Sequence, residues 1–131
     1  MKTFLLTGLV MAVLDFVWLK FIVSSFFFKQ IGHLVQTKGE GFDISYFPAA
    51  FTYILMVTGL MVFVYPMSAG DPQKALLYGG LMGLVIYGVY EGTNMATLKN
   101  WPLKMLVVDT LWGVLLCGAT AGLVTFLVGK I

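Results

Sequence analysis

The sequence predicts an all-α integral membrane protein: a four-helix bundle of four transmembrane spans, with both termini on the same side of the membrane. Composition is the first reason, because 60% of the 131 residues are hydrophobic and only 11% are charged. Soluble domains typically carry about 25% charged residues. The second reason is that the hydrophobic residues gather in four runs, each long enough for the about 20 residues that a spanning helix needs. We therefore expect a single transmembrane domain over residues 1–131.

The first span is expected over residues 3–28. It is too long for the hydrophobic part of a signal peptide and carries Asp15 at its centre, so we interpret it as a helix of the mature protein. Residues 29–45 follow as the one long polar loop, which contains the turn-forming residues of the stretch 38–41.

The second span is expected over residues 47–67, where Pro48 suits the first turn of a helix. The short turn 68–72 joins it to a third span over residues 74–98, so these two helices form an antiparallel hairpin. Trp101 and Pro102 end the third span, and the fourth covers residues 103–129.

The charges exclude several classes of function. The net charge is +2, and the eight basic residues are lysines spread singly along the chain, so no nucleic-acid-binding surface is expected. Cys117 is the single cysteine and cannot form a disulfide within the chain. His33 has no second His or Cys near it, so we expect no metal and no cofactor. The lysines divide almost evenly between the two membrane sides and give only a weak preference for termini outside the cell.

Small residues indicate where two helices can approach closely in lipid. Three glycine pairs have the spacing that allows direct backbone contact. They are Gly79 and Gly83, Gly88 and Gly92, and Gly118 and Gly122. Packing within one bundle is favoured over a dimer face, and a homodimer stays open as an alternative.

Three acids lie inside the apolar spans: Asp15, Glu91 and Asp109. At 1.5 Å per residue Asp15 is about 16 Å into its span, near the midplane. The alternating direction of the spans puts the other two acids in the half of the membrane away from the termini. A charged side chain at the bilayer centre costs about 2.5–3.5 kcal/mol, so the acids should face one another in a shared, partly hydrated cleft. We expect at least one of them to carry a proton, and we expect the half near the termini to be apolar.

Aromatic, hydroxyl and amide residues accompany these acids. Each of Asp15 and Asp109 has a Trp three positions later, a spacing that keeps both side chains on one helix face. The predicted ligand-binding residues are Asp15, Trp18, Tyr87, Glu91, Thr93, Asn94, Thr97, Asp109 and Trp112.

Four stretches of the sequence resemble a known family. They are Leu14-Asp-Phe-Val-Trp-Leu19, Gly32-His-Leu34, Tyr90-x-x-Thr-Asn-x-Ala-Thr-Leu-x-x-Trp-Pro102 and Val108-Asp-Thr-Leu-Trp-Gly113. Together they are similar to domain of unknown function 2177, a bacterial family of small four-helix predicted membrane proteins. The resemblance covers nearly the whole chain. It implies a four-helix fold and a place in the bacterial inner (cytoplasmic) membrane, and it implies no activity.

Three classes of function are compatible with these residues. The leading hypothesis is a pocket in one leaflet that binds or translocates a small cation or an amphiphilic ligand in exchange for protons, with tryptophans as cation–π partners and membrane lipid around it. The alternative is a membrane enzyme whose paired carboxyl groups perform acid/base chemistry on a lipid or isoprenoid. The third is a structural or accessory subunit in which the acids fix the helix packing. Whether the protein is an enzyme stays open at this point.

Overall fold

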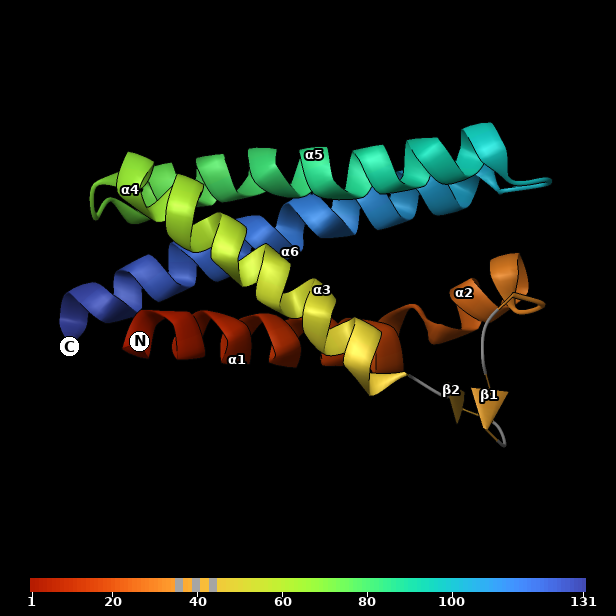
Figure 1. The fold of residues 1–131 in the computed structure, drawn as a ribbon, viewed down its shortest axis with the longest axis horizontal. Helices are drawn as coiled ribbons and strands as arrows, with labels where there is room; N and C mark the ends of the chain where they lie inside the picture. Colours follow the sequence, from red (N-terminus) through yellow and green to blue (C-terminus); the bar gives the residue numbers. More distant parts are fainter. Residues whose placement is uncertain (35–36, 39–40, 43–44) are drawn as a thin grey trace.

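The computed structural model describes residues 1–34, 37–38, 41–42 and 45–131. Four helices in it are long and apolar enough to cross a membrane, which confirms the predicted fold class. They are Lys2–Ile22, Tyr46–Ser68, Pro72–Thr97 and Leu103–Lys130. The N- and C-termini lie at the same end of the bundle (Figure 1), as an even number of spans requires.

The first spanning helix changes geometry after Asp15. Helix α1 covers Lys2–Val17 and continues as the π-helical turn η1, Trp18–Ile22. Val23 then leaves helical geometry (φ −117°, ψ −3°), and its N–H donates to the Trp18 carbonyl, five residues back, at 2.9 Å. A separate helix, α2 (Ser24–Ile31), follows at the end of the bundle away from the termini (Figure 1). The expected span over residues 3–28 therefore covers α1, η1 and the first half of α2.

The expected polar loop begins with the end of α2. It contains two short antiparallel strands, β1 (Thr37–Lys38) and β2 (Gly41–Phe42). Residues 35–36, 39–40 and 43–44 of the predicted loop lie outside the described residues.

The second spanning helix widens just before a proline. Helix α3 (Tyr46–Gly59) continues as the π-helical turn η2 (Leu60–Val64) and then as α4 (Tyr65–Ser68). Pro66 has no N–H, and its ring would clash with the carbonyl group four residues earlier in a regular α-helix. The Tyr65 N–H donates to the Leu60 carbonyl instead, five residues back, so the wider turn accommodates the proline.

A tight turn leads into the second half of the molecule. Ala69 (φ 51°) and Gly70 (φ 80°) adopt left-handed conformations that reverse the chain. The Asp71 carboxylate then caps helix α5 (Pro72–Thr97) by accepting the Gln73 N–H at 2.9 Å. A short connection joins α5 to helix α6 (Leu103–Lys130).

Glycines bring α5 and α6 into direct backbone contact along their length. A Cβ atom at Gly79 would lie 2.6 Å from the Cys117 carbonyl oxygen, and one at Gly83 would overlap the Gly113 carbonyl oxygen. A Cβ atom at Gly118 would lie 3.0 Å from the Leu76 carbonyl oxygen. Two of the three predicted glycine pairs therefore pack within the bundle, as the spacing indicated.

The remaining pair does not make such a contact. A Cβ atom at Gly92 would meet nothing within 4 Å, and at Gly88 the nearest atom is a Thr110 methyl carbon at 3.9 Å. Gly113, which belongs to no such pair, is the tighter position, because a Cβ atom there would overlap the ring of Tyr87.

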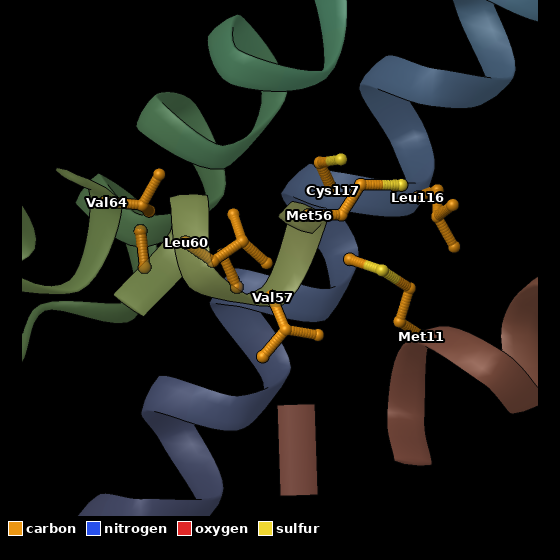
Figure 2. Close-up of a cluster of buried hydrophobic side chains, with 9 residues drawn as sticks. Met11, Met56, Val57, Leu60, Val64, Leu116 and Cys117 are labelled. Atoms are coloured by element: carbon orange, nitrogen blue, oxygen red, sulfur yellow. The ribbon is translucent and has the colours of Figure 1, made fainter. Parts of the chain in front are cut away.

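A compact cluster of buried apolar residues lies where α1, α3 with η2, and α6 meet (Figure 2). Figure 2 labels its members Met11, Met56, Val57, Leu60, Val64, Leu116 and Cys117. Helix α6 is the central helix. In its most apolar stretch 44% of the residues are buried inside the bundle, compared with 11% in the corresponding stretch of the first span. The large apolar side chains on the outside of α1 and α3 remain exposed, which suits a surface facing lipid.

Candidate functional site

The two acids of the α5–α6 pair face each other inside the bundle. Glu91 is 0% exposed and Asp109 is 9% exposed. Their carboxyl groups lie within hydrogen-bonding reach of each other. A hydrogen bond between two carboxyl groups needs a proton on one of them, because an ionised carboxylate can only accept.

The connection between α5 and α6 folds back onto this pair. Trp101 lies in that connection, and its Nε1–H donates to Glu91 Oε2 at 2.6 Å. Asn100 has a positive φ of 60°, which helps the chain reverse within a few residues. Sequence reasoning placed Trp101 at the end of a span and missed this bond. The bond could have been predicted from the short connection between the two helices, since a Trp in it can reach back to the helix that precedes it.

Asp15 joins the first two spans to α6. Its Oδ2 accepts the hydroxyl proton of Tyr53 in α3, and its Oδ1 accepts Trp112 Nε1–H of α6 at 2.9 Å. Asp15 also interacts electrostatically with Asp109. The three acids predicted to converge are therefore brought into one group, which we call the carboxyl cluster (Asp15, Glu91 and Asp109).

Two tryptophans form a flat aromatic wall beside the carboxyl cluster. The rings of Trp18 and Trp112 are stacked, with centroids 4.5 Å apart and planes at 4°. Trp112 Nε1 is bonded to Asp15, whereas Trp18 Nε1 is buried without a hydrogen-bond partner in the part of the chain that the structure describes. The π-helical turn that begins at Trp18 is the kind of local distortion that often occurs at functional sites.

Tyr87 lies between the acids and the apolar cluster. Its ring packs over Gly113, which has no side chain to occupy that space. Its hydroxyl is close enough to Asp15 and Asp109 to interact with both. Tyr53, which is not among the predicted ligand-binding residues, is a further neighbour of Tyr87.

Three of the predicted polar residues do not join the carboxyl cluster through any described bond. Thr93 and Thr97 are exposed, and the Thr97 hydroxyl donates to the Thr93 carbonyl at 2.8 Å within its own helix. Asn94 is partly buried, and its carbonyl accepts the Leu98 N–H at the end of α5. For Thr93 and Thr97 the reason is helical phase: at 100° per residue they are turned by about 200° and 240° from the inward-facing Glu91, so their side chains face outward.

The cluster has unused bonding capacity, and the charged neighbours of Asp109 carry no positive charge. Three buried polar atoms at this end have no partner among the described residues: Trp18 Nε1, Glu91 Oε1 and Thr110 Oγ1. The charged neighbours of Asp109 are Glu91 and Asp15, which are both acids. Among the described residues, no group of three or more His, Cys, Asp or Glu side chains is arranged to hold a metal ion.

The half of the bundle near the termini is less apolar than the sequence indicated. The hydroxyl groups of Thr7 and Tyr65 are hydrogen-bonded at 2.7 Å, and Thr7 also donates to the Thr3 carbonyl at 2.7 Å. A groove of about 280 Å³ opens beside them. Single Thr and Tyr residues inside apolar runs gave no strong pattern, so this second polar group was not predicted.

The fold and the carboxyl cluster define an integral membrane protein with acids enclosed among its spanning helices. The chain belongs to the predicted membrane protein family DUF2177, whose profile matches residues 1–127. No curated protein and no solved structure matches the chain.

Proposed function

We propose that the carboxyl cluster binds a small cation or a cationic amphiphile in exchange for protons, and that the protein does this in the bacterial inner membrane. The supporting observation is the composition of the cluster. Three carboxyl groups share one site inside the bundle, and the charged neighbours of Asp109 are acids. Like charges this close cannot all be ionised in an apolar surrounding, so protons or a cation must neutralise them.

The walls of the cluster suit an organic cation. Trp18 and Trp112 each cover one face of the other in the stack, so they offer a cation their two outer faces, and the N–H edge of Trp112 meets Asp15. Aromatic faces attract cations, and the attraction grows when water is excluded. Trp18 Nε1 adds a donor that has no partner among the described residues. Asp15 is partly exposed on the lipid-facing first span, which gives an amphiphile a lateral route to the site.

The exchange follows from charge balance. The proton that Glu91 and Asp109 share keeps part of the cluster neutral while no ligand is bound. A bound cation supplies that positive charge itself, so the proton leaves for water. Because either a proton or a cation can neutralise the cluster, the two compete, and competition of this kind couples the movement of one to the movement of the other.

A structural role is the second candidate, and one observation favours it. The bonds from Tyr53 and Trp112 to Asp15 tie α3 and α6 to α1 through one side chain. Polar groups of this kind can fix helix packing in a membrane. In that case the acids would matter for stability and not for ligand binding.

The experiment is a calorimetric titration of the purified protein with tetraphenylphosphonium, in two buffers that differ in protonation enthalpy. We expect binding with release of about one proton per cation. Triphenylphosphine oxide has similar aryl groups without the charge and should not release a proton.

Matched variants separate the two candidates. Asp109→Asn and Glu91→Gln should lose proton release and weaken cation binding. Asp71→Asn is the control, because Asp71 caps α5 outside the cluster and Asn caps equally well. Equal cation binding in all the variants, or no proton release in the unaltered protein, would contradict the proposal and leave the structural role.

A further inference from the structure

We propose that the groove near the termini is a water-filled vestibule for the carboxyl cluster, and that the apolar cluster around Cys117 is the barrier between the two. This inference rests on the proposed function, because it names the route by which protons and ligand would reach the acids from that side.

The groove lies between the N-terminal part of α1, helix α4 with its following turn, and the C-terminal part of α6. Its lining residues are Thr3, Tyr65, Gly70, Val124, Thr125, Val128 and Gly129. These elements meet at the end of the bundle that holds both termini (Figure 1). A volume of about 280 Å³ is enough for several water molecules, each of which takes about 30 Å³ in the liquid.

Hydroxyl groups continue from this groove into the bundle. The Thr7 hydroxyl donates to the Thr3 carbonyl, so in its bond with Tyr65 it is the acceptor and the Tyr65 hydroxyl donates. Thr7 is fully buried, whereas Thr3 and Tyr65 line the groove. The chain of bonds therefore starts in the groove wall and ends inside the helix packing.

The lining and the position of the groove indicate water as the occupant. Tyr65 lines the groove, and its hydroxyl oxygen can still accept a hydrogen bond because its proton goes to Thr7. Water can donate to this oxygen, whereas a lipid acyl chain cannot. The groove also lies at the end of the bundle that holds the termini, where spanning helices meet water.

One face of α6 runs from the groove to the acids. Its residues follow one another at intervals of three or four positions and so share one side of the helix. They are Val128, Val124, Thr120, Cys117, Gly113 and Asp109. At 1.5 Å per residue this face is about 28 Å long, close to the thickness of the hydrocarbon layer.

The apolar cluster interrupts this path at Cys117. Met11, Met56 and Leu60 converge there from α1, α3 and η2 (Figure 2), and all are buried. Thr120 lies three residues beyond Cys117 on the groove side, and Asp109 lies eight residues before it. Methionine side chains adapt easily to a changed packing, and the π-helical turn that carries Leu60 is a place where helix register can change. The barrier is therefore built from the adaptable parts of the molecule.

The first experiment measures water in the groove. Thr125→Cys and Phe126→Cys are each made with Cys117→Ser in the full chain and reconstituted in lipid vesicles. A membrane-impermeant methanethiosulfonate reagent is added on the side of the termini. Thr125 lines the groove, whereas Phe126 is 49% exposed on the outer surface at the same depth. We expect labelling of Thr125→Cys to be more than about tenfold faster, because the reactive thiolate forms only in contact with water.

The second experiment tests the barrier with the native Cys117 as the reporter. Cys117 is 1% exposed and should not react in the unaltered protein. Leu60→Ala removes part of the apolar barrier and should make Cys117 reactive from the side of the termini. The smaller truncation Leu60→Val should give a smaller increase in the labelling rate of Cys117. Val62→Ala is the control, since Val62 lies in the same π-helical turn but is 55% exposed.

The outcomes separate this inference from the proposed function. Equal labelling of Thr125→Cys and Phe126→Cys would overturn the vestibule, whatever the cation titration gives. Unchanged Cys117 reactivity in both Leu60 variants, with Thr125→Cys labelled, would overturn the barrier. If both labelling results are as expected and tetraphenylphosphonium does not bind, the vestibule stands and the proposed function fails.

Discussion

The two halves of the bundle pack in different ways. In the α5–α6 pair, glycines such as Gly79 and Gly83 bring one backbone against the other. The first two spans lack such contacts, and each contains a π-helical turn, η1 or η2. Helix α6 touches both halves, but its contact with α5 is much the more extensive.

This difference bears on the carboxyl cluster, which lies across the boundary. Glu91 and Asp109 both belong to the tightly packed pair, whereas Asp15 and its donor Tyr53 belong to the other half. The bond from Trp112 to Asp15 is the described hydrogen bond that links the two halves at the cluster. The comparison teaches that Glu91 and Asp109 lie on two helices in direct backbone contact, while the third acid, Asp15, lies in the half that lacks such contacts.

The largest effect should come from separating α5 and α6. Gly83→Ala places a methyl group against the Gly113 carbonyl oxygen and forces the helices apart. We expect a loss of about 3 kcal/mol in the free energy of unfolding, the upper part of the range for overpacking. Titration with sodium dodecyl sulfate, followed by circular dichroism, measures it.

The control for this change lies on the same helix. Gly92→Ala meets nothing within 4 Å and should leave the protein as stable as before or slightly more stable, because Ala is the better helix former. If both variants lose equal stability, the glycine contact is not what holds the pair together.

A smaller effect should come from cutting the link between the halves. Trp112→Phe keeps an aromatic ring in the stack but removes the N–H that Asp15 accepts. We expect a loss of about 2 kcal/mol in the free energy of unfolding, because the Asp15 carboxyl group loses a donor inside the bundle.

Trp18→Phe is the matched variant in the same stack. It removes an N–H that has no partner among the described residues, so the loss of stability should come only from the smaller buried ring area. Similar losses for the two tryptophans would show that the bond to Asp15 does not link the halves.

The bond inside the tight pair should matter somewhat less. Trp101→Phe removes the donor to Glu91 Oε2 and should cost about 1.5 kcal/mol. Tyr90→Phe, at an exposed neighbouring position on α5, should change nothing measurable. A Trp101→Phe protein as stable as the unaltered one would mean that the connection between α5 and α6 does not depend on this bond.

The smallest effect is expected at the end of the bundle that holds the termini. Tyr65→Phe removes the donor to Thr7 and should cost about 0.6 kcal/mol, the average for such bonds between membrane helices. Tyr78→Phe, a partly buried position on α5 with no described hydrogen bond, is the comparison. If Tyr65→Phe lost more stability than Trp101→Phe, the hydrogen bond near the termini would matter more than the bond to Glu91, which would contradict this prediction.

The spans and the convergence of the three acids followed from the sequence, because hydropathy sets which segments cross and length sets the depth of each residue. Rotation of each helix about its axis did not follow. Thr93 and Thr97 were predicted as ligand-binding residues from their depth in the membrane. Because Glu91 faces inward, both side chains lie on the outer side of the helix. Rotation also decides that Tyr53 bonds to Asp15, and it depends on how α3 packs against α1.

Two other features were not predicted from the sequence. Gly113 has no glycine partner at the usual spacing, so its contact with the ring of Tyr87 had no local signal. The π-helical turn η2 arises because Pro66 cannot make a regular helical hydrogen bond. The turn η1 ends at the break at Val23, and no proline in the sequence marks that position.

The most direct test of the central claim is the infrared spectrum of the purified protein in the region where protonated carboxyl groups absorb. We predict a protonated carboxyl band at neutral pH that is lost or shifted in both Glu91→Gln and Asp109→Asn, remains in Asp71→Asn, and weakens when tetraphenylphosphonium is added. A spectrum without such a band, or with a band that neither variant nor the cation changes, would contradict a proton shared between Glu91 and Asp109 and exchanged for a cation.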